Sequence, residues 1–156
     1  MANSDAMPAR FGHVNLIARD WRALAEFYAE VFGCEAVPPA RDQGGEWLAR
    51  GTGVAGATLS GIHLRLPGHG ENGPTLEIYS YGHNLPRGGE PAANREGYGH
   101  IAFAVDDVDA CARAVVAAGG SLAGEIVRRE IAGVGVLTFV YARDPEGNLI
   151  ELQRWS

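Results

Sequence analysis

The chain has 156 residues, of which 46% are hydrophobic and 21% charged, as in an ordinary globular domain with a buried core. Its formal net charge of −6 argues against nucleic acid or an anionic membrane surface as a partner, because both bind basic proteins. The sequence shows no signal-peptide pattern and no apolar run long enough to span a bilayer, and its 2 cysteines are too few for a disulfide scaffold. We therefore expect a cytoplasmic protein without nucleic-acid or membrane partners.

An internal repeat relates the two halves of the chain. The stretches "FGHVNLIARD" at 11–20 and "YGHIAFAVDD" at 98–107 share an aromatic residue, a glycine, a histidine, an apolar run and an aspartate. His13 thus corresponds to His100, and Asp20 to Asp107. Each apolar run predicts a strand. Each aspartate is suited to cap a following helix, because its carboxylate accepts the free amide hydrogens of the first turn.

Amphipathic segments follow both aspartates. Residues 21–33, "WRALAEFYAEVFG", and residues 108–120, "VDACARAVVAAGG", predict helices that end at glycines, which adopt the left-handed conformation common at helix ends. The apolar side chains recur at helical spacing. They are Leu24, Tyr28, Val31 and Phe32 in the first helix, and Val108, Cys111, Ala112 and Val115 in the second.

Short strand-like runs separated by turns follow each helix. They are "EWLARG" (46–51), "GIHLRLP" (61–67) and "TLEIYSY" (75–81) in the first half, and "VRREIA" (127–132), "VLTFVYA" (136–142) and "NLIELQR" (148–154) in the second. Each half therefore predicts a β-α-β-β-β module, and the fold class is α+β. We expect one domain over 1–156, with modules at 11–82 and 98–156 and a Gly/Pro-rich linker at 83–97.

Four potential metal ligands share one face of the predicted sheets. Side chains alternate along a strand, so bulky apolar neighbours that face the helix leave His13, Glu77, His100 and Glu151 on the opposite face. These side chains converge if the first and last strands of each half are neighbours. Two imidazoles and two carboxylates suit a divalent Ni, Co, Zn, Mn or Fe ion, whereas burying the carboxylates without a cation is costly. The sequence therefore predicts one divalent metal ion.

Further polar residues are candidates for binding a small-molecule substrate. His63 and Arg65 share the open face of the strand at 61–67, and the guanidinium suits a carboxylate or phosphate. A neighbouring acidic residue is an equally good partner for Arg65. Tyr79 and Tyr141 fit either a pocket wall or the core.

The sequence resembles the vicinal oxygen chelate superfamily. This superfamily includes glyoxalase I, methylmalonyl-CoA epimerase, extradiol dioxygenases and the fosfomycin- and bleomycin-resistance proteins. "GHIAFAVDD" and "DPEGNLIEL" carry the resemblance most specifically. It implies paired βαβββ modules that form a curled mixed sheet around a metal ion held by His13, Glu77, His100 and Glu151. It also implies a homodimer, with the site completed either across the dimer or by both halves of one chain. By the same resemblance Glu151, and after it Glu77, are the expected catalytic bases.

The ligand set resembles that of bacterial glyoxalase I. The epimerase usually has glutamine where Glu77 stands. Ile17 and Tyr81 occupy positions at which glutathione-using glyoxalases carry arginine and asparagine, so we expect no glutathione requirement. The expected function is that of a lyase or isomerase which moves a proton next to a metal-chelated carbonyl, where the ion stabilises an enediolate or enolate.

Two alternative functions come from the same superfamily. An Fe(II) extradiol-type dioxygenase is suggested by "YARDPEGNLIE" at 141–151, although the histidine that this signature requires upstream is missing. A metal-free small-molecule binding protein, like those that confer bleomycin resistance, is the other alternative. The complete ligand set argues against it.

Overall fold

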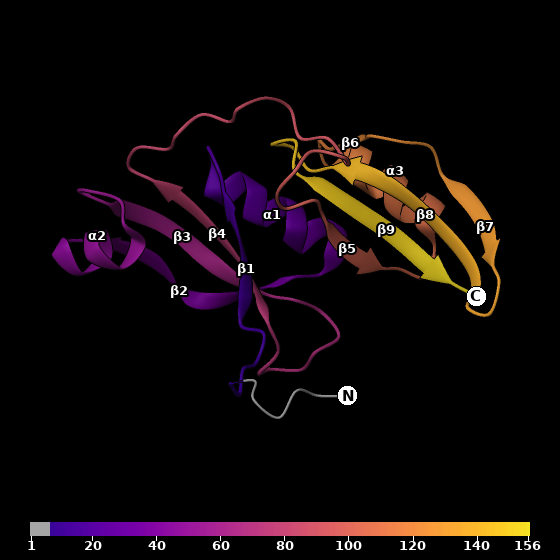
Figure 1. The fold of residues 1–156 in the computed structure, drawn as a ribbon, viewed down its shortest axis with the longest axis horizontal. Helices are drawn as coiled ribbons and strands as arrows, with labels where there is room; N and C mark the ends of the chain where they lie inside the picture. Colours follow the sequence, from indigo (N-terminus) through magenta and orange to yellow (C-terminus); the bar gives the residue numbers. More distant parts are fainter. Residues whose placement is uncertain (1–6) are drawn as a thin grey trace.

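The computed structural model describes residues 7–156 and confirms the α+β fold of two related modules (Figure 1). The first module comprises β1 (His13–Ile17), α1 (Trp21–Phe32), β2 (Glu35–Gly44), α2 (Glu46–Thr52), β3 (Thr58–Arg65) and β4 (Thr75–Tyr81). The second comprises β5 (Ile101–Ala104), α3 (Val108–Ala117), β6 (Ser121–Leu122), β7 (Val127–Ile131), β8 (Gly135–Arg143) and β9 (Leu149–Trp155). No helix in the described range 7–156 has the length and hydrophobicity needed to cross a membrane.

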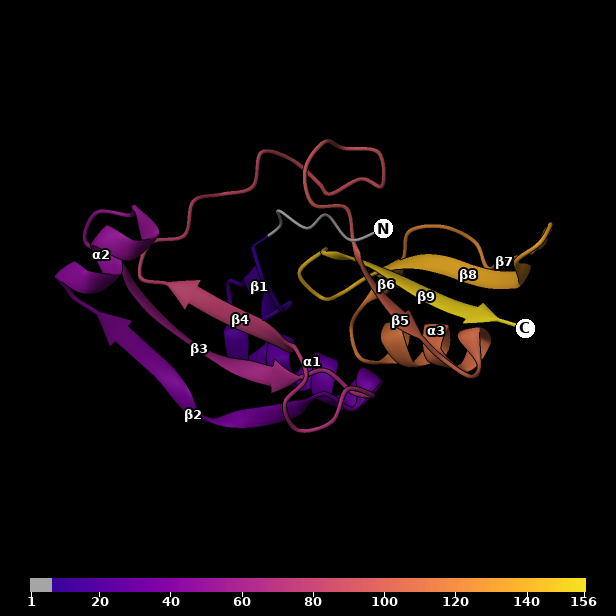
Figure 2. The same ribbon diagram turned by 60° about the horizontal axis from the view of Figure 1, so that its bottom comes forward.

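Each module forms its own mixed sheet. The strand order is β1-β4-β3-β2 in the first and β5-β9-β8-β6 in the second, where β7 also pairs with β8. The first and last strands of each module, β1 with β4 and β5 with β9, are parallel neighbours, and the other pairs are antiparallel. β1 and β5 lie at the inner edges of the two sheets (Figure 1 and Figure 2).

The predicted N-terminal caps of both helices and the glycine end of α1 are confirmed, whereas α3 ends at Ala117 with Ala118 as its cap, before the predicted glycines. The carboxylate of Asp20 accepts hydrogen bonds from the backbone amides of Arg22 and Ala23, and Asp107 accepts one from Ala110. α1 ends at Gly33, whose φ of 68° is left-handed and therefore favours glycine.

One predicted strand is wrong. Residues 46–51 begin a short helix, α2, which lies between Gly45 and Gly53 and anchors Leu48 among buried side chains. The sheet edge belongs instead to β2, whose Pro38 and Pro39 fall where its register with β3 shifts. Proline cannot donate to a sheet ladder and is confined to edges and bulges, so this strand lacks the usual sequence pattern.

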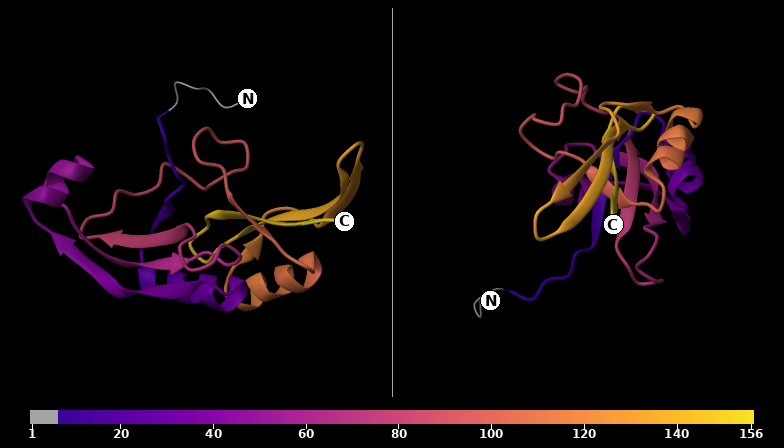
Figure 3. Two further views of the ribbon diagram at one scale, coloured as in Figure 1. Left: turned by 90° about the horizontal axis from the view of Figure 1, so that it is seen from below. Right: turned by 90° about the vertical axis from the view of Figure 1, so that its right-hand side faces the viewer.

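The two modules share one hydrophobic core. α1 and α3 cover the same side of the two sheets (Figure 3), and their apolar side chains form a single buried cluster with strands of both modules. Phe32 of the first module stacks on Phe103 of the second, with ring centroids 3.9 Å apart. The opposite faces of both sheets are therefore turned away from the helices.

The turn at 144–148 also joins the modules. The buried carboxylate of Asp144 accepts a hydrogen bond from the Tyr28 hydroxyl at 2.9 Å. The carboxylate of Glu146 accepts from the backbone amides of Arg19 and Asp20, at 2.8 and 2.9 Å. A negative charge beside the N-terminus of α1 is also favourable for the helix dipole.

Candidate functional site

One predicted histidine–glutamate pair forms on the sheet of the second module. The Nε2 atom of His100, just before β5, lies 2.9 Å from Oε2 of Glu151 in β9. The ring of Tyr141 lies beside His100, with centroids 4.7 Å apart. Parallel pairing of β5 and β9 brings these side chains together, because Ala102 is the residue in register with Glu151 and His100 precedes it by two positions.

The corresponding pair forms on the first module by the same geometry. Asn15 is in register with Glu77, and His13 precedes Asn15 by two positions. Nε2 of His13 lies 3.6 Å from Oε1 of Glu77, and the amide of Asn15 donates to the same oxygen at 2.9 Å. The repeat in the sequence therefore becomes a repeated His–Glu pair in the structure.

His63 contacts the carboxylate of Glu77 from the other side. Its Nε2 lies 2.8 Å from Oε2 of Glu77 and 3.1 Å from the Tyr79 hydroxyl, and its Nδ1 lies 2.9 Å from Oγ1 of Thr75. Desolvation lowers the pKa of His63, although the Glu77 carboxylate opposes this effect. A neutral imidazole has one N–H, and the carboxylate can only accept, so Nε2 is the donor and Nδ1 accepts from Thr75.

The other predicted substrate-binding residues have different surroundings. Arg65 donates to the carboxylate of Glu35 at 3.0 Å. Its partner in the structure is therefore a neighbouring acidic residue, one of the two partners that the sequence allowed. Tyr79 is buried in the small cluster around Leu48. Burial and the hydrogen-bonded Glu77 carboxylate raise the pKa of Tyr79 to about 12, so the phenol stays protonated at neutral pH. Tyr141 remains beside the second His–Glu pair.

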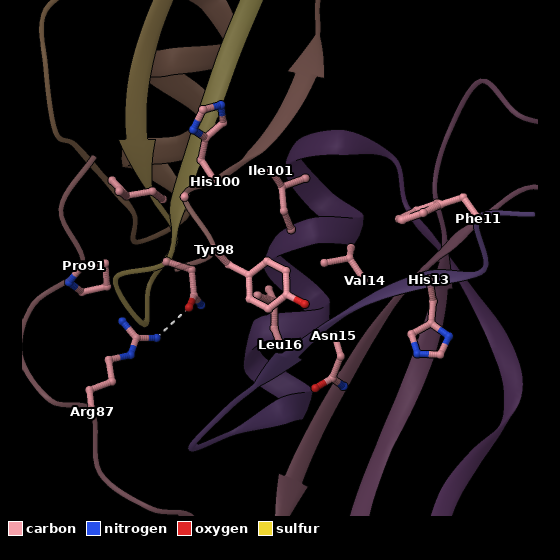
Figure 4. A pocket seen from close by; sticks show the side chains of 13 residues that line it. Phe11, His13, Val14, Asn15, Leu16, Arg87, Pro91, Tyr98, His100 and Ile101 are labelled. Atoms are coloured by element: carbon pink, nitrogen blue, oxygen red, sulfur yellow. Dashed lines mark hydrogen bonds between the residues drawn. The ribbon is translucent and has the colours of Figure 1, made fainter. Parts of the chain in front are cut away.

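A cavity of about 710 Å³ separates the inner edges of the two modules. His13 and His100 stand on opposite sides of it, with Tyr98, Val14 and Ile101 between them (Figure 4). Residues 7–156 of one chain contain no group of three or more His, Cys, Asp or Glu side chains that could hold a metal ion. The first and last strands of each module are neighbours, but within one chain the four side chains do not converge as expected and form two separate pairs of donors.

Two further residues, Asn15 and Arg87, lie at the site without a clear signal in the sequence. Asn15 donates to Glu77, and the only signal for it in the sequence is its place two positions after His13, on the same face of β1. Arg87 in the linker lines the cavity and donates to Asn148 at 2.6 Å (Figure 4). This contact joins segments 61 positions apart, and no local pattern predicts it.

Comparison with known proteins gives matches at the level of family and fold. The family model described as the Glyoxalase/Bleomycin resistance protein/Dioxygenase superfamily matches residues 10–152. A glyoxalase family protein from Bacillus cereus is 21% identical, with 99% of each chain covered and a TM-score of 0.83. An integron cassette protein of V. cholerae is 26% identical, with 97% of this chain and 98% of that chain covered and a TM-score of 0.56.

A further structure with a similar fold is the fosfomycin resistance protein FosX from Listeria monocytogenes, complexed with Mn(II) and sulfate. It is 17% identical, with 96% of this chain and 95% of that chain covered and a TM-score of 0.54. No curated protein sequence matches the chain.

Proposed function

Because the chain belongs to the Glyoxalase/Bleomycin resistance protein/Dioxygenase superfamily, we propose that it is a divalent-metal-dependent lyase or isomerase that moves a proton next to a carbonyl of a small substrate. The observation that carries this proposal is the repeated pair, His13 with Glu77 and His100 with Glu151, on the sheet faces turned away from the helices. Repetition of a two-donor unit is difficult to explain by sheet stability alone, since two hydrophobic pairs would pack as well.

The four side chains fit a borderline divalent ion by their chemistry, since imidazole and carboxylate both suit Ni, Co, Zn, Mn and Fe(II). His13 keeps 48% of its side chain exposed and His100 keeps 27%, so both imidazoles are accessible for binding. The two donors of each pair come from neighbouring parallel strands, which supports a half-site of fixed geometry.

A second copy of the chain is proposed to complete the site. The two pairs of one chain stay separate, and the edges of β1 and β5 that face away from β4 and β9 have no strand partner within residues 7–156. A twofold dimer that sets the first module of one chain against the second module of the other would form two equivalent four-donor sites. His13 and Glu77 would then come from one chain, and His100 and Glu151 from its partner.

Proton transfer is assigned to Glu151. A bound divalent ion would polarise the substrate carbonyl and stabilise the negative charge that develops on its oxygen. Oε2 of Glu151 contacts His100, which leaves Oε1 to take the proton from the carbon beside the carbonyl and to return it at the neighbouring carbon. Tyr141 lies next to this pair and is proposed as part of the substrate-binding wall.

Glutathione is not expected as a co-substrate. Ile17 is apolar and partly exposed, and Tyr81 packs against the buried cluster around Leu48. Neither residue offers the guanidinium or amide group that glutathione-using relatives are expected to carry at these positions. A small substrate that chelates through its own two oxygen atoms fits better.

Metal content of the purified protein tests the proposal. Elemental analysis after loading with Mn²⁺ should find about one ion per chain, as two four-donor sites per dimer require. His13→Ala and His100→Ala should each lose most of it, because a borderline site depends strongly on each imidazole. His83→Ala, in the exposed linker, is the matched control and should keep the parental content.

The two alternative functions, a metal-free binding protein and an extradiol dioxygenase, give different results with the purified protein and its variants. Unchanged metal content in both histidine variants would overturn the proposal and favour a metal-free binding protein. Consumption of O₂ with cleavage of a catechol by the Fe(II)-loaded protein, retained in Glu77→Ala, would favour the extradiol dioxygenase.

A further inference from the structure

The two glutamates of the proposed site occupy equivalent strand positions but have different neighbours. Glu77 lies in register with Asn15 on β1 and with His63 on β3. Glu151 lies in register with Ala102 on β5 and with Tyr141 on β8. Among the residues in register with the two glutamates, only those beside Glu77 can donate a hydrogen bond from an amide or an imidazole.

The donors around Glu77 are divided between its two carboxylate oxygens. Oε1, which faces His13 at 3.6 Å, accepts from the Asn15 amide at 2.9 Å. Oε2 accepts from Nε2 of His63 at 2.8 Å. Two bonds from opposite sides define the plane of the carboxylate, and the oxygen nearer His13 is the one that His63 does not use.

His63 is itself held on both sides of its ring. Thr75 contacts its Nδ1 at 2.9 Å, and the Tyr79 hydroxyl lies 3.1 Å from its Nε2. The side chain of His63 is 19% exposed. A ring fixed in this way can fix the orientation of the carboxylate that it contacts.

Glu151 lacks such support. Among the described residues His100 is its hydrogen-bond partner, through Oε2. Ala102 has no side-chain donor, and Tyr141 contacts the ring of His100. One oxygen of Glu151 is therefore free of the constraints that hold both oxygens of Glu77.

We propose that His63 is a positioning residue that locks Glu77 as a permanent metal ligand, so that Glu151 alone is free to move the proton. This assignment rests on the proposed metal-dependent function. Residues that orient a ligand in this way typically change metal affinity by about 10- to 100-fold when they are removed.

Metal affinity of the His63→Leu variant tests this assignment, with Mn²⁺ as the probe and titration calorimetry as the measurement. We expect Mn²⁺ binding to weaken by about 10-fold or more, while the stoichiometry stays the same. His63→Gln, whose amide can still donate to Glu77, should restore most of the affinity. His69→Leu makes the same change at an exposed histidine in the turn between β3 and β4, and its Mn²⁺ affinity should stay parental.

The visible absorption spectrum of the Co²⁺-loaded protein provides a second readout, because it reports the ligand geometry rather than the stability of the fold. It should change in His63→Leu and stay parental in His69→Leu. If His63→Leu fails to fold, Asn15→Ala removes the other donor from an exposed position and should also weaken Mn²⁺ binding.

Each contrary result has a distinct meaning. Parental affinity and spectrum in His63→Leu would overturn the positioning role while the proposed function stands. Loss of the ion from His63→Leu with retention in His13→Ala would make His63 a ligand and would also overturn it. Absence of Mn²⁺ binding in the unmodified protein would overturn the proposed function, and the positioning role with it.

Discussion

Glu151 and Glu77 differ at the scale of single residues, although the repeat places them at equivalent positions. Glu77 is bonded through both oxygens, by Asn15 and His63, whereas Glu151 contacts His100 through one. A carboxylate that moves a proton must change its interactions during the reaction, and a carboxylate held on both sides cannot do so without loss of those bonds. The surroundings therefore favour different roles for two chemically identical groups.

Replacement of each carboxylate by its amide separates these roles. Glu151→Gln should lower the rate of proton exchange by about 100-fold or more, the size expected for loss of a general base, while it keeps part of its metal through the amide oxygen. Glu77→Gln should mainly weaken metal binding. The rates are measured by NMR, as deuterium incorporation into small 2-oxo and α-hydroxycarbonyl compounds in D₂O with saturating metal. Parental exchange in Glu151→Gln would contradict the assignment.

At the scale of elements, the N-terminus of α1 connects the site to the core. The side chain of Asp20 caps α1, and its backbone amide donates to Glu146 from the other module. α1 in turn packs beneath β3 and β4, which carry His63 and Glu77. Local capping and contact between modules thus stabilise the same helix end.

The Asp20→Ala variant tests the contribution of this cap. It should lower the free energy of unfolding by about 0.5–2 kcal/mol, as loss of an N-cap carboxylate does in other helices. Urea denaturation measures the change. Asp107→Ala, which removes the equivalent cap of α3, should have a similar effect, and metal content should stay parental in both variants. A parental unfolding midpoint for Asp20→Ala would contradict the prediction.

At the scale of the whole molecule, the proposed dimer determines which residues meet. α1 and α3 cover one side of both sheets, so each chain turns both His–Glu pairs toward the other side. A shared core that includes the stacked rings of Phe32 and Phe103 resists the rotation that would be needed to bring the two pairs of one chain together. The complete site is therefore expected between chains.

Mixing two inactive variants tests this arrangement. His13→Ala keeps an intact pair on its second module, and His100→Ala keeps one on its first. A mixed dimer of the two should regain one four-donor site, so co-refolded protein should bind Mn²⁺ and recover part of the exchange activity. Neither variant alone should do so. Failure of the mixture to bind Mn²⁺, with both single variants folded, would place the complete site within one chain.

Much of the local structure could be predicted from the sequence because it depends on near neighbours. Residues 75–81 form β4 with the predicted bounds, and Asp20 and Gly33 delimit α1. Alternation along the strands correctly placed Glu77 and Glu151 opposite the helices. The error at 46–51 arose because α2 depends on one buried side chain, Leu48, too little to produce a helical pattern.

The sequence by itself determined the repeat, the two helices with their N-terminal caps, and the strand face on which the paired histidines and glutamates lie. These features follow from side-chain periodicity and from hydrogen bonds within a few residues. The tertiary structure alone decided that Arg65 pairs with Glu35, that His63 supports Glu77, and that the two pairs of one chain stay apart. Such features depend on strand register and on the packing of one module against the other, because they join residues that are distant in the chain and carry no local pattern.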